Sequence, residues 1–163
     1  MPTERRPINH PAGICRSKFA RRAVLNGIAV AVCIALNPGF ARAGDTLTAP
    51  EAFAQASAGR IVLIDVRSPR EWRDTGVPAG ARTVTIHQGS RGFLRGILQA
   101  AGGDKNRPIA LICARGNRSS RGKRFLEANG FSKVIDVPEG MIGRGRAPGW
   151  IARKLPTRPC AKC

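Results

Sequence analysis

Short runs rich in apolar and β-branched residues recur along the chain after residue 60. They fall at residues 61–64, 83–86, 109–112 and 134–137. The run at 61–64 is continuously apolar up to Asp65, a pattern typical of a strand buried on both faces of a parallel sheet. We therefore predict strands at these positions.

Helix-start signals stand between these runs. Two capping boxes place a hydroxyl residue three positions before a glutamate, Thr48 with Glu51 and Ser68 with Glu71. Pro69 occupies a first helical position, where its missing N–H costs nothing. Further helices are expected at about 92–101 and 119–129, the second closed by Gly130. Strands that alternate with helices predict an α/β fold with a parallel sheet, in which ligands sit at the carboxyl ends of the strands.

The first 43 residues have a different layout. They contain seven basic residues and one acid, an uncharged stretch at 23–36, a helix breaker at Pro38 and a small-residue site at Ala41-Arg42-Ala43. This order predicts a signal peptide cleaved after Ala43. The uncharged stretch is shorter than the roughly 20 residues that a membrane span needs, so we expect periplasmic export without a stable membrane anchor. Arg21-Arg22 is similar to a twin-arginine signal, although Sec export stays open.

The rest of the chain is expected to form one domain at 44–155 and a Pro- and Cys-containing tail at 156–163. The chain has 28 basic and 10 acidic residues, a net charge of +18, and +12 remains once the leader is removed. This charge indicates anionic substrates or partners. The chain has no tyrosine and 5% aromatic residues, whereas readers of single-stranded nucleic acid use exposed aromatic rings. We therefore expect a small anion, and no nucleic acid, as the partner.

Three of the five cysteines lie outside the leader: Cys113, Cys160 and Cys163. In an oxidising compartment an odd number leaves one thiol free or intermolecular. Cys160 and Cys163 do not precede a helix as a thioredoxin-like motif would, and a zinc site would need two further ligands. Two interpretations remain, a local disulfide or a redox-active dithiol in a loosely held tail that reaches Cys113.

The strand at 109–112 leads into Cys113, the candidate nucleophile. A cysteine just past a buried strand, in a short loop that opens a helix, lies among backbone N–H groups at the positive end of that helix. Such surroundings favour thiolate, the nucleophilic form of cysteine. Arg115 and Arg118 add positive charge beside it, so the loop can attract a small anion. The alternative is a buried structural thiol, which would need neither the glycine nor the arginines.

The loop resembles that of the rhodanese superfamily, commonly Cys-x-x-Gly-x-Arg-Ser. The matching residues are Cys113, Gly116, Arg118 and Ser119. Further similar segments bring the resemblance to about residues 47–150: Leu63-Ile-Asp65-Val66-Arg67, Glu71-Trp72, Gly80-Ala81 and Gly130-Phe131. The resemblance implies a five-stranded parallel sheet flanked by helices.

The resemblance also implies sulfur transfer through a persulfide on Cys113. The donor would be a small anion such as thiosulfate, and the acceptor cyanide or a thiol, including a thiol on a protein. The backbone of the following residues would bind the persulfide or the anion: Ala114, Arg115, Gly116, Asn117, Arg118 and Ser119. No cofactor and no metal are implied. Asp65 and Arg67 follow a strand end and are expected to form an ion pair that braces the active loop. His87 is expected to be a surface or core residue, because a preformed thiolate requires no base.

Two other functions stay open. One is a sulfur carrier or sulfur-sensing module without turnover. The other is an arsenate reductase or phosphatase of the same fold, whose loop has five residues between cysteine and arginine; here four residues separate Cys113 from Arg118. The sequence also departs from the family pattern. The segment 76–83 lacks the usual histidine and asparagine, and the usual Gly-Gly is Glu139-Gly140. A basic, glycine-rich loop at 143–149 is expected to border the site.

Overall fold

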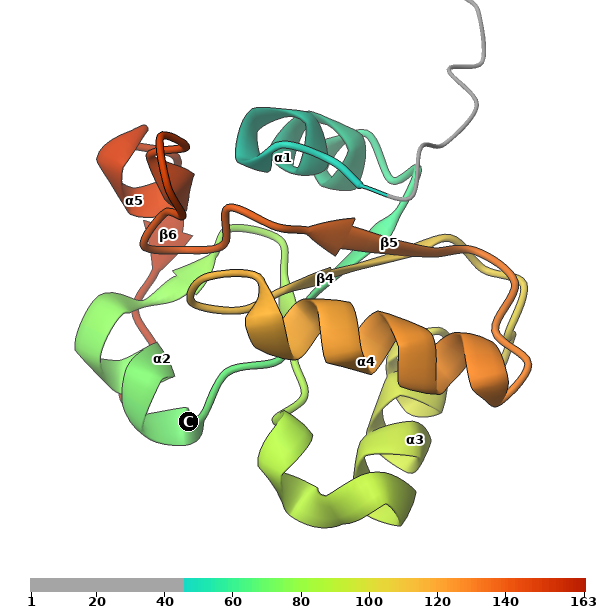
Figure 1. Ribbon diagram of the computed structural model, residues 1–163. Helices are drawn as coiled ribbons and strands as arrows, with labels where there is room; N and C mark the ends of the chain where they lie inside the picture. The colour runs from blue at the N-terminus through green and yellow to red at the C-terminus, as the bar shows by residue number, and fades with distance from the viewer. Residues whose placement is uncertain (1–45) are drawn as a thin grey trace, which may run out of the picture. The chain divides into compact units, whose positions relative to one another are not determined.

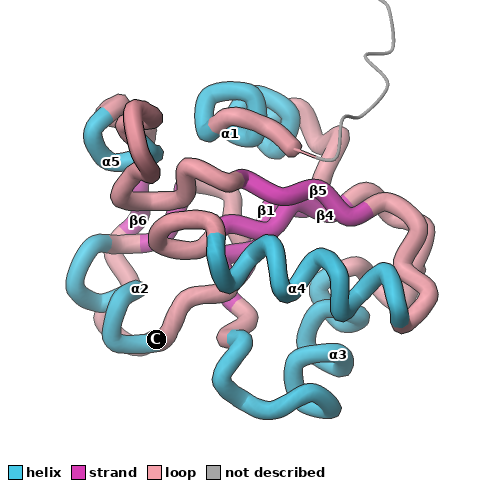
Figure 2. The backbone as a smooth tube through the Cα atoms, viewed as in Figure 1, coloured by secondary structure: helices cyan, strands magenta, loops and turns pink. Residues whose placement is uncertain are grey.

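Four parallel strands form the sheet at the centre of the domain (Figures 1 and 2). The structure is a computed structural model and describes residues 46–163. The sheet has the order β3-β1-β4-β5, with β1 at Val62–Asp65, β3 at Arg82–Thr83, β4 at Ile109–Ile112 and β5 at Val134–Val137. Every residue of β1, β4 and β5 is buried, as their apolar patterns predict. The predicted leader, with Cys15 and Cys33, lies outside the described residues.

The α/β class with a parallel sheet is confirmed, and two details differ from expectation. Where five strands were implied, the sheet of the described residues has four, and next to β5 stands a single parallel bridge between Thr46 and Asp136. The predicted strand at 83–86 is wrong over most of its length, because β3 ends at Thr83. The hydroxyl of Thr85 accepts a hydrogen bond from the His87 N–H at 3.3 Å, which starts the 3-10 turn η1 (Ile86–Gln88) instead.

Helices cover both faces of the sheet (Figure 1). The short α5 (Gly149–Ala152) and α1 (Ala49–Ser57) lie over one face, and α3 (Gly89–Ala100) and α4 (Asn117–Ala128) over the other. Successive strand side chains point to opposite faces. In β4, Ala110 and Ile112 accordingly join the core under α1 and α5, whereas Ile109 and Leu111 join the core under α3 and α4. No helix within residues 46–163 is long and apolar enough to cross a bilayer.

Both predicted capping boxes form. Thr48 caps α1 together with Glu51, and Ser68 caps α2 (Pro69–Thr75) together with Glu71. Helix α4 begins at Asn117, two residues before the predicted start, because Gly116 in the left-handed conformation (φ 83°) already turns the chain into the helix.

The C-terminal tail pairs with the rest of the domain, unlike the loosely held tail of the dithiol interpretation. Strand β6 (Thr157–Arg158) pairs with β2 (Val77–Pro78) in an antiparallel ribbon. The indole N–H of Trp150 donates to the Pro156 carbonyl at 3.0 Å. Cys160 and Cys163 form a disulfide and pack against the core under α1 and α5. Of the two interpretations, the structure contains the local disulfide.

Candidate active site

Cys113 lies directly after β4, at the carboxyl edge of the sheet. It is 1% exposed and is the free cysteine of the described residues. The Gly116 N–H donates to its sulfur at 3.1 Å, and the Ser119 hydroxyl lies 3.5 Å from the sulfur and 3.0 Å from the Gly116 carbonyl. The loop therefore folds back on the thiol and surrounds it with donors.

A second segment, residues 138–142, fixes the orientation of this loop. The Met141 N–H donates to the Cys113 carbonyl at 2.8 Å, and the Ile142 N–H to the Ala114 carbonyl at 2.9 Å. Because a trans peptide points its N–H opposite to its carbonyl, these bonds turn the amides of Ala114 and Arg115 to the other side. The first amides of α4, including that of Arg118, also lack intrahelical acceptors because of their position. The loop thus has spare N–H groups for an anion.

Two glycines allow these segments to touch. A Cβ on Gly116 would lie 2.2 Å from the Pro138 carbonyl oxygen, and a Cβ on Gly140 would lie 2.5 Å from the Ala114 carbonyl oxygen. Both glycines also have positive φ, at 83° and 64°. No other residue fits at either position without moving the backbone.

Arg118 is held by Glu71 rather than extended toward solvent. Its two terminal nitrogens reach the two carboxylate oxygens of Glu71 at 2.7 and 2.5 Å. The hydrogen bond from Arg118 lowers the pKa of Glu71 from 4.5 to about 2. The same bond raises the pKa of Arg118, and the nearby Cys113 sulfur adds to this effect. The fork geometry of arginine makes such a bidentate pair strong and directional.

Sequence reasoning missed two residues of this cluster. Glu71 was expected to cap a helix and to match the family pattern, and His87 to be a surface or core residue. The surface position of His87 is confirmed, but the contact of either residue with Arg118 was not foreseen. His87 is exposed, and its Nε2 lies 3.3 Å from Nη1 of Arg118. Glu71 and Arg118 are 47 positions apart, and no local pattern relates them. The match of Glu71-Trp72 to the family pattern was the one signal that pointed to this position.

Asp65 and Arg67 form the expected ion pair, at 2.7 Å and with both side chains buried. The pair supports α2 rather than contacting the Cys113 loop directly. Arg67 donates to the Thr75 hydroxyl at 2.7 Å and to the carbonyls of Gly76 and Glu71 at 2.6 and 3.3 Å. It therefore joins the end of β1 to the helix that presents Glu71.

Asp136 is a buried carboxyl on β5, close to the start of α4. Its Oδ1 has no hydrogen-bond partner among the described residues. Burial raises its pKa, and the Ser119 hydroxyl partly offsets this rise.

Glu139 replaces the first glycine of the usual pair and serves as a buried anchor. Its carboxylate accepts the Ala49 N–H at 2.5 Å, the Gly149 N–H at 3.1 Å and the Arg153 Nε–H at 3.1 Å. Glu139, the departure from the family pattern, therefore holds α1, α5 and the end of the basic loop at 143–149 together.

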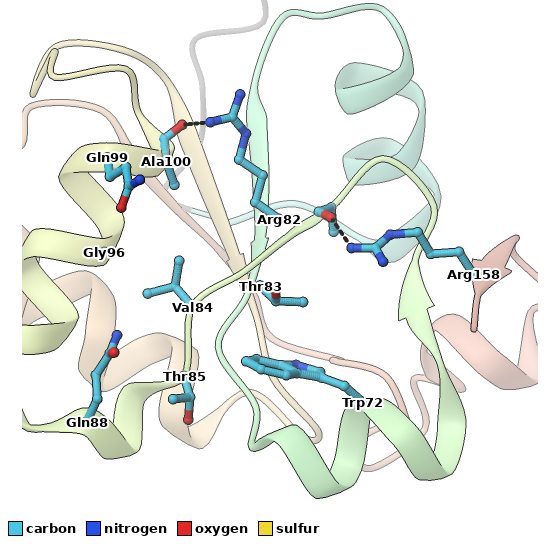
Figure 3. A pocket seen from close by; sticks show the side chains of 11 residues that line it. Trp72, Arg82, Thr83, Val84, Thr85, Gln88, Gly96, Gln99, Ala100 and Arg158 are labelled. Carbon is cyan, nitrogen blue, oxygen red and sulfur yellow. Dashed lines mark hydrogen bonds between the residues drawn. The ribbon is translucent and has the colours of Figure 1, made fainter. Parts of the chain in front are cut away.

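A hollow of about 650 Å³ lies along β3, away from the cysteine (Figure 3). The side chains of Trp72, Val84 and Gln88 line it, and its arginines, Arg82 and Arg158, donate to the carbonyls of Ala100 and Ala81. None of the residues 113–119 lines this hollow. The candidate chemistry therefore belongs to the Cys113 loop and not to this hollow.

Comparisons with known proteins support the family resemblance that the Cys113 loop shows. The family model described as Rhodanese-like domain matches residues 48–143, more than half of the chain. The chain is 29% identical over 79 residues to "Thiosulfate sulfurtransferase GlpE" of Pseudomonas syringae, a match that covers 48% of this chain and 67% of that protein.

Two solved structures are similar in fold. Rv0390 from M. tuberculosis has a TM-score of 0.54 and 27% identity, over 71% of this chain and 97% of that one. The polysulfide-sulfur transferase homodimer from Wolinella succinogenes has a TM-score of 0.54 and 22% identity, over 72% of this chain and 82% of that one. At that identity the second likeness shows the fold alone.

Proposed function

The chain belongs to the rhodanese-like domain family, and on that premise we propose that it is a sulfurtransferase that carries sulfane sulfur on Cys113. The observation that supports this most is the position of the thiol. Its sulfur accepts the Gly116 N–H at 3.1 Å, inside a loop whose first two carbonyls are held by Met141 and Ile142. Backbone donors around a sulfur favour thiolate and persulfide, which are both anions.

The reaction takes place in two displacements. The Cys113 thiolate attacks the outer sulfur of thiosulfate, an S–S bond forms, the donor S–S bond breaks, and sulfite leaves with the electron pair. The acceptor, a thiolate or cyanide, then attacks the outer sulfur of the persulfide. The electron pair of the broken S–S bond returns to Cys113 as thiolate. Charge and atoms balance in each step, and the spare loop amides stabilise the anion that is present at each stage.

Arg118 has a positioning role in this proposal. Its bond to Glu71 fixes the first turn of α4, and its positive charge stays beside the loop that receives an anionic donor. We further propose that the chain acts in the periplasm after cleavage at Ala43. Edman sequencing of the protein recovered from a periplasmic fraction tests this, with an N-terminus at Gly44 expected; a chain retained in the cytoplasm with its leader intact contradicts it.

Intact-mass measurement after incubation with thiosulfate tests the chemistry. One added sulfur on the Cys113 peptide is expected, and Cys113→Ser is expected to abolish both the adduct and thiocyanate formation while circular dichroism stays unchanged. Oxygen is similar in shape but is a far poorer nucleophile toward sulfane sulfur. The Cys160→Ser, Cys163→Ser double variant is the matched control and keeps the adduct. A sulfur adduct in the Cys113→Ser chain would exclude the assigned nucleophile.

A sulfur carrier without turnover is the second candidate. The near-complete burial of Cys113 favours it, because a sheltered persulfide is protected from adventitious thiols. The two candidates differ in a single assay. A sulfurtransferase forms thiocyanate continuously from thiosulfate and cyanide, whereas a carrier stops after one equivalent.

A further inference from the structure

Two large apolar side chains are exposed next to the Cys113 loop. Ile142 is 49% exposed and Ile151 is 41% exposed. Their backbones are neighbours, because the Ile151 N–H donates to the Met141 carbonyl at 3.0 Å, while Ile142 itself donates to Ala114. The two isoleucines therefore mark a solvent-facing apolar spot that is tied to the candidate site.

A short hairpin carries positive charge beside this spot. Arg144 and Ala147 exchange both of their backbone hydrogen bonds, at 2.9 and 3.0 Å, so Arg146 lies at the tip of a tight turn. At the base of the turn, a Cβ on Gly149 would lie 2.3 Å from the Gly143 nitrogen. We call residues 143–149 the arginine hairpin. Because the two ends of the hairpin touch each other, Arg144 and Arg146 have defined backbone positions.

Three arginines near this surface form no ion pair with another described residue, although the charge of Arg144 acts on the buried Asp136 carboxyl and partly offsets the rise that burial causes in its pKa. The ion pairs within residues 46–163 involve none of Arg115, Arg144 and Arg146, and all three residues are exposed. Arg153 behind the hairpin is different, since it pairs with Glu139 at 3.1 Å. The surface thus combines an apolar centre with unpaired positive charge at its rim, an arrangement typical of protein interfaces.

We propose that Ile142, Ile151 and the arginine hairpin form the docking surface for an acidic protein that presents a thiol to the Cys113 persulfide. This inference rests on the proposed sulfurtransferase function and names its acceptor class. The thiolate of the partner attacks the outer sulfur, a new S–S bond forms on the partner, the persulfide S–S bond breaks, and Cys113 leaves as thiolate. A small acceptor such as cyanide needs none of this surface.

A protein fits this surface better than a nucleic acid. Isoleucine side chains offer no stacking surface for bases, and no Phe or Trp of the described residues is exposed. An apolar centre instead suits an apolar side chain next to the thiol of the partner.

The test uses the full chain loaded with thiosulfate and two peptide acceptors. Each peptide has one cysteine beside a leucine, flanked by glutamates in one peptide and by lysines in the other. Transfer to the glutamate peptide is expected to be about tenfold faster at low ionic strength, and added salt is expected to close this gap. Arg144→Glu with Arg146→Glu removes the preference, whereas the rate with cyanide stays unchanged. Ile142→Ser slows transfer to the glutamate peptide by about threefold, the scale of about one buried CH₂.

A matched control separates the hairpin from overall charge. Arg91→Glu with Arg95→Glu reverses two exposed charges on α3, over the opposite face of the sheet, and is expected to keep the preference. Equal rates with both peptides overturn the proposal, as does the same loss in the control. If duplex DNA slows sulfur transfer by the wild-type chain but not by the hairpin variant, the surface binds nucleic acid, and this result overturns the proposal as well.

Peptide binding keeps this test independent of the chemistry. Fluorescence anisotropy of the two peptides against the Cys113→Ser chain measures docking without transfer, and tighter binding of the glutamate peptide is expected. Failure to form any persulfide refutes the proposed function and with it the role of the surface in sulfur transfer, while tighter binding of the glutamate peptide would still show the docking surface. Equal binding of both peptides refutes the docking surface alone.

Discussion

The two capping boxes share a sequence motif but differ in what their glutamates do. In α1, Glu51 accepts a hydrogen bond from the Thr48 N–H at 2.8 Å and is exposed to solvent. In α2, Glu71 accepts from the Ser68 N–H at 3.0 Å and also pairs with Arg118 at the candidate site. One glutamate caps a helix, and the other caps a helix and also contacts Arg118 beside the Cys113 loop.

The two helices are also tied to the sheet by opposite charges. The buried carboxylate of Glu139 accepts the first amide of α1, at Ala49, whereas the buried guanidinium of Arg67 donates to the carbonyl of Glu71 within α2 and to that of Gly76 just after it. A local motif therefore identifies where each helix starts. Its surroundings decide whether the cap affects chemistry or only stability.

The largest effect is expected when the clamp of α2 is removed. Arg67→Ala removes the guanidinium that neutralises the buried Asp65 carboxylate and leaves it only the backbone N–H of residue 67 as a donor among the described residues, so the free energy of unfolding should fall by about 3–5 kcal/mol. Urea denaturation measures the change. Arg70→Ala, which breaks an exposed pair with Asp74, is the control and should cost no more than about 1 kcal/mol. Equal losses in both variants would show that the buried clamp has no special role.

Arg118→Ala is expected to have the next largest effect. It breaks the contact with Arg118 that Glu71 has and Glu51 lacks. The same change removes the positive charge beside the loop; a charge-assisted interaction with an anionic donor contributes roughly 1.5–3 kcal/mol, so kcat/KM for thiosulfate should fall by about 10- to 150-fold. An uncharged trisulfide donor should lose less. Steady-state kinetics with both donors measures the difference. Equal losses would mean that Arg118 only shapes the loop.

The acid dependence of stability compares the two glutamates directly. The folded pKa of Glu71 is about 2, below the ordinary 4.5, so its stabilising contribution is complete above about pH 4.5 and disappears as the pH falls through about 2. In Glu71→Gln the free energy of unfolding should therefore decrease less than in the wild type as the pH falls from about 4.5 to about 2. The difference from the wild type should be smaller in Glu51→Gln, because the pKa of Glu51 is lowered only by the cap hydrogen bonds. Urea unfolding across this pH range measures both, and identical profiles would contradict the comparison.

The smallest effect concerns the cap hydroxyls. Thr48→Ala and Ser68→Ala should each lower stability by about 1 kcal/mol, as is usual for lost N-caps. Only Ser68→Ala should also lower thiosulfate turnover, since it loosens Glu71 and with it Arg118. Thermal unfolding and turnover assays on both variants show whether the caps separate in this way. Loss of turnover in Thr48→Ala would contradict it.

The sequence predicted those features that depend on neighbouring residues. The strand at β1, the caps of α1 and α2, and the cysteine at the end of β4 all follow from local patterns, and the structure contains each of them. The prediction of a strand at 83–86 was wrong because the Thr85 side chain accepts a hydrogen bond from the following turn. A pattern of apolar residues carries no information about such a side-chain contact.

The remaining features depend on contacts between distant segments. The pairing of Glu71 with Arg118 joins positions 47 residues apart, and Glu139 meets Ala49 across 90 residues. Neither contact has a local signature, and from the sequence Glu139 was only a missing glycine. The resemblance to the rhodanese superfamily identified the loop residues, but it did not indicate which of them face the sulfur.

The contact between Gly116 and Pro138 has a consequence for engineering. Widening the Cys113 loop by one residue, as a tetrahedral oxyanion would require, pushes it against a carbonyl that a Cβ on Gly116 would already meet at 2.2 Å. The opposing Gly140 closes the other side. A library that varies only residues 114–119 would therefore sample mainly chains with a displaced backbone. New substrate scope has to come from libraries that remodel 114–119 and 138–142 together, as one module.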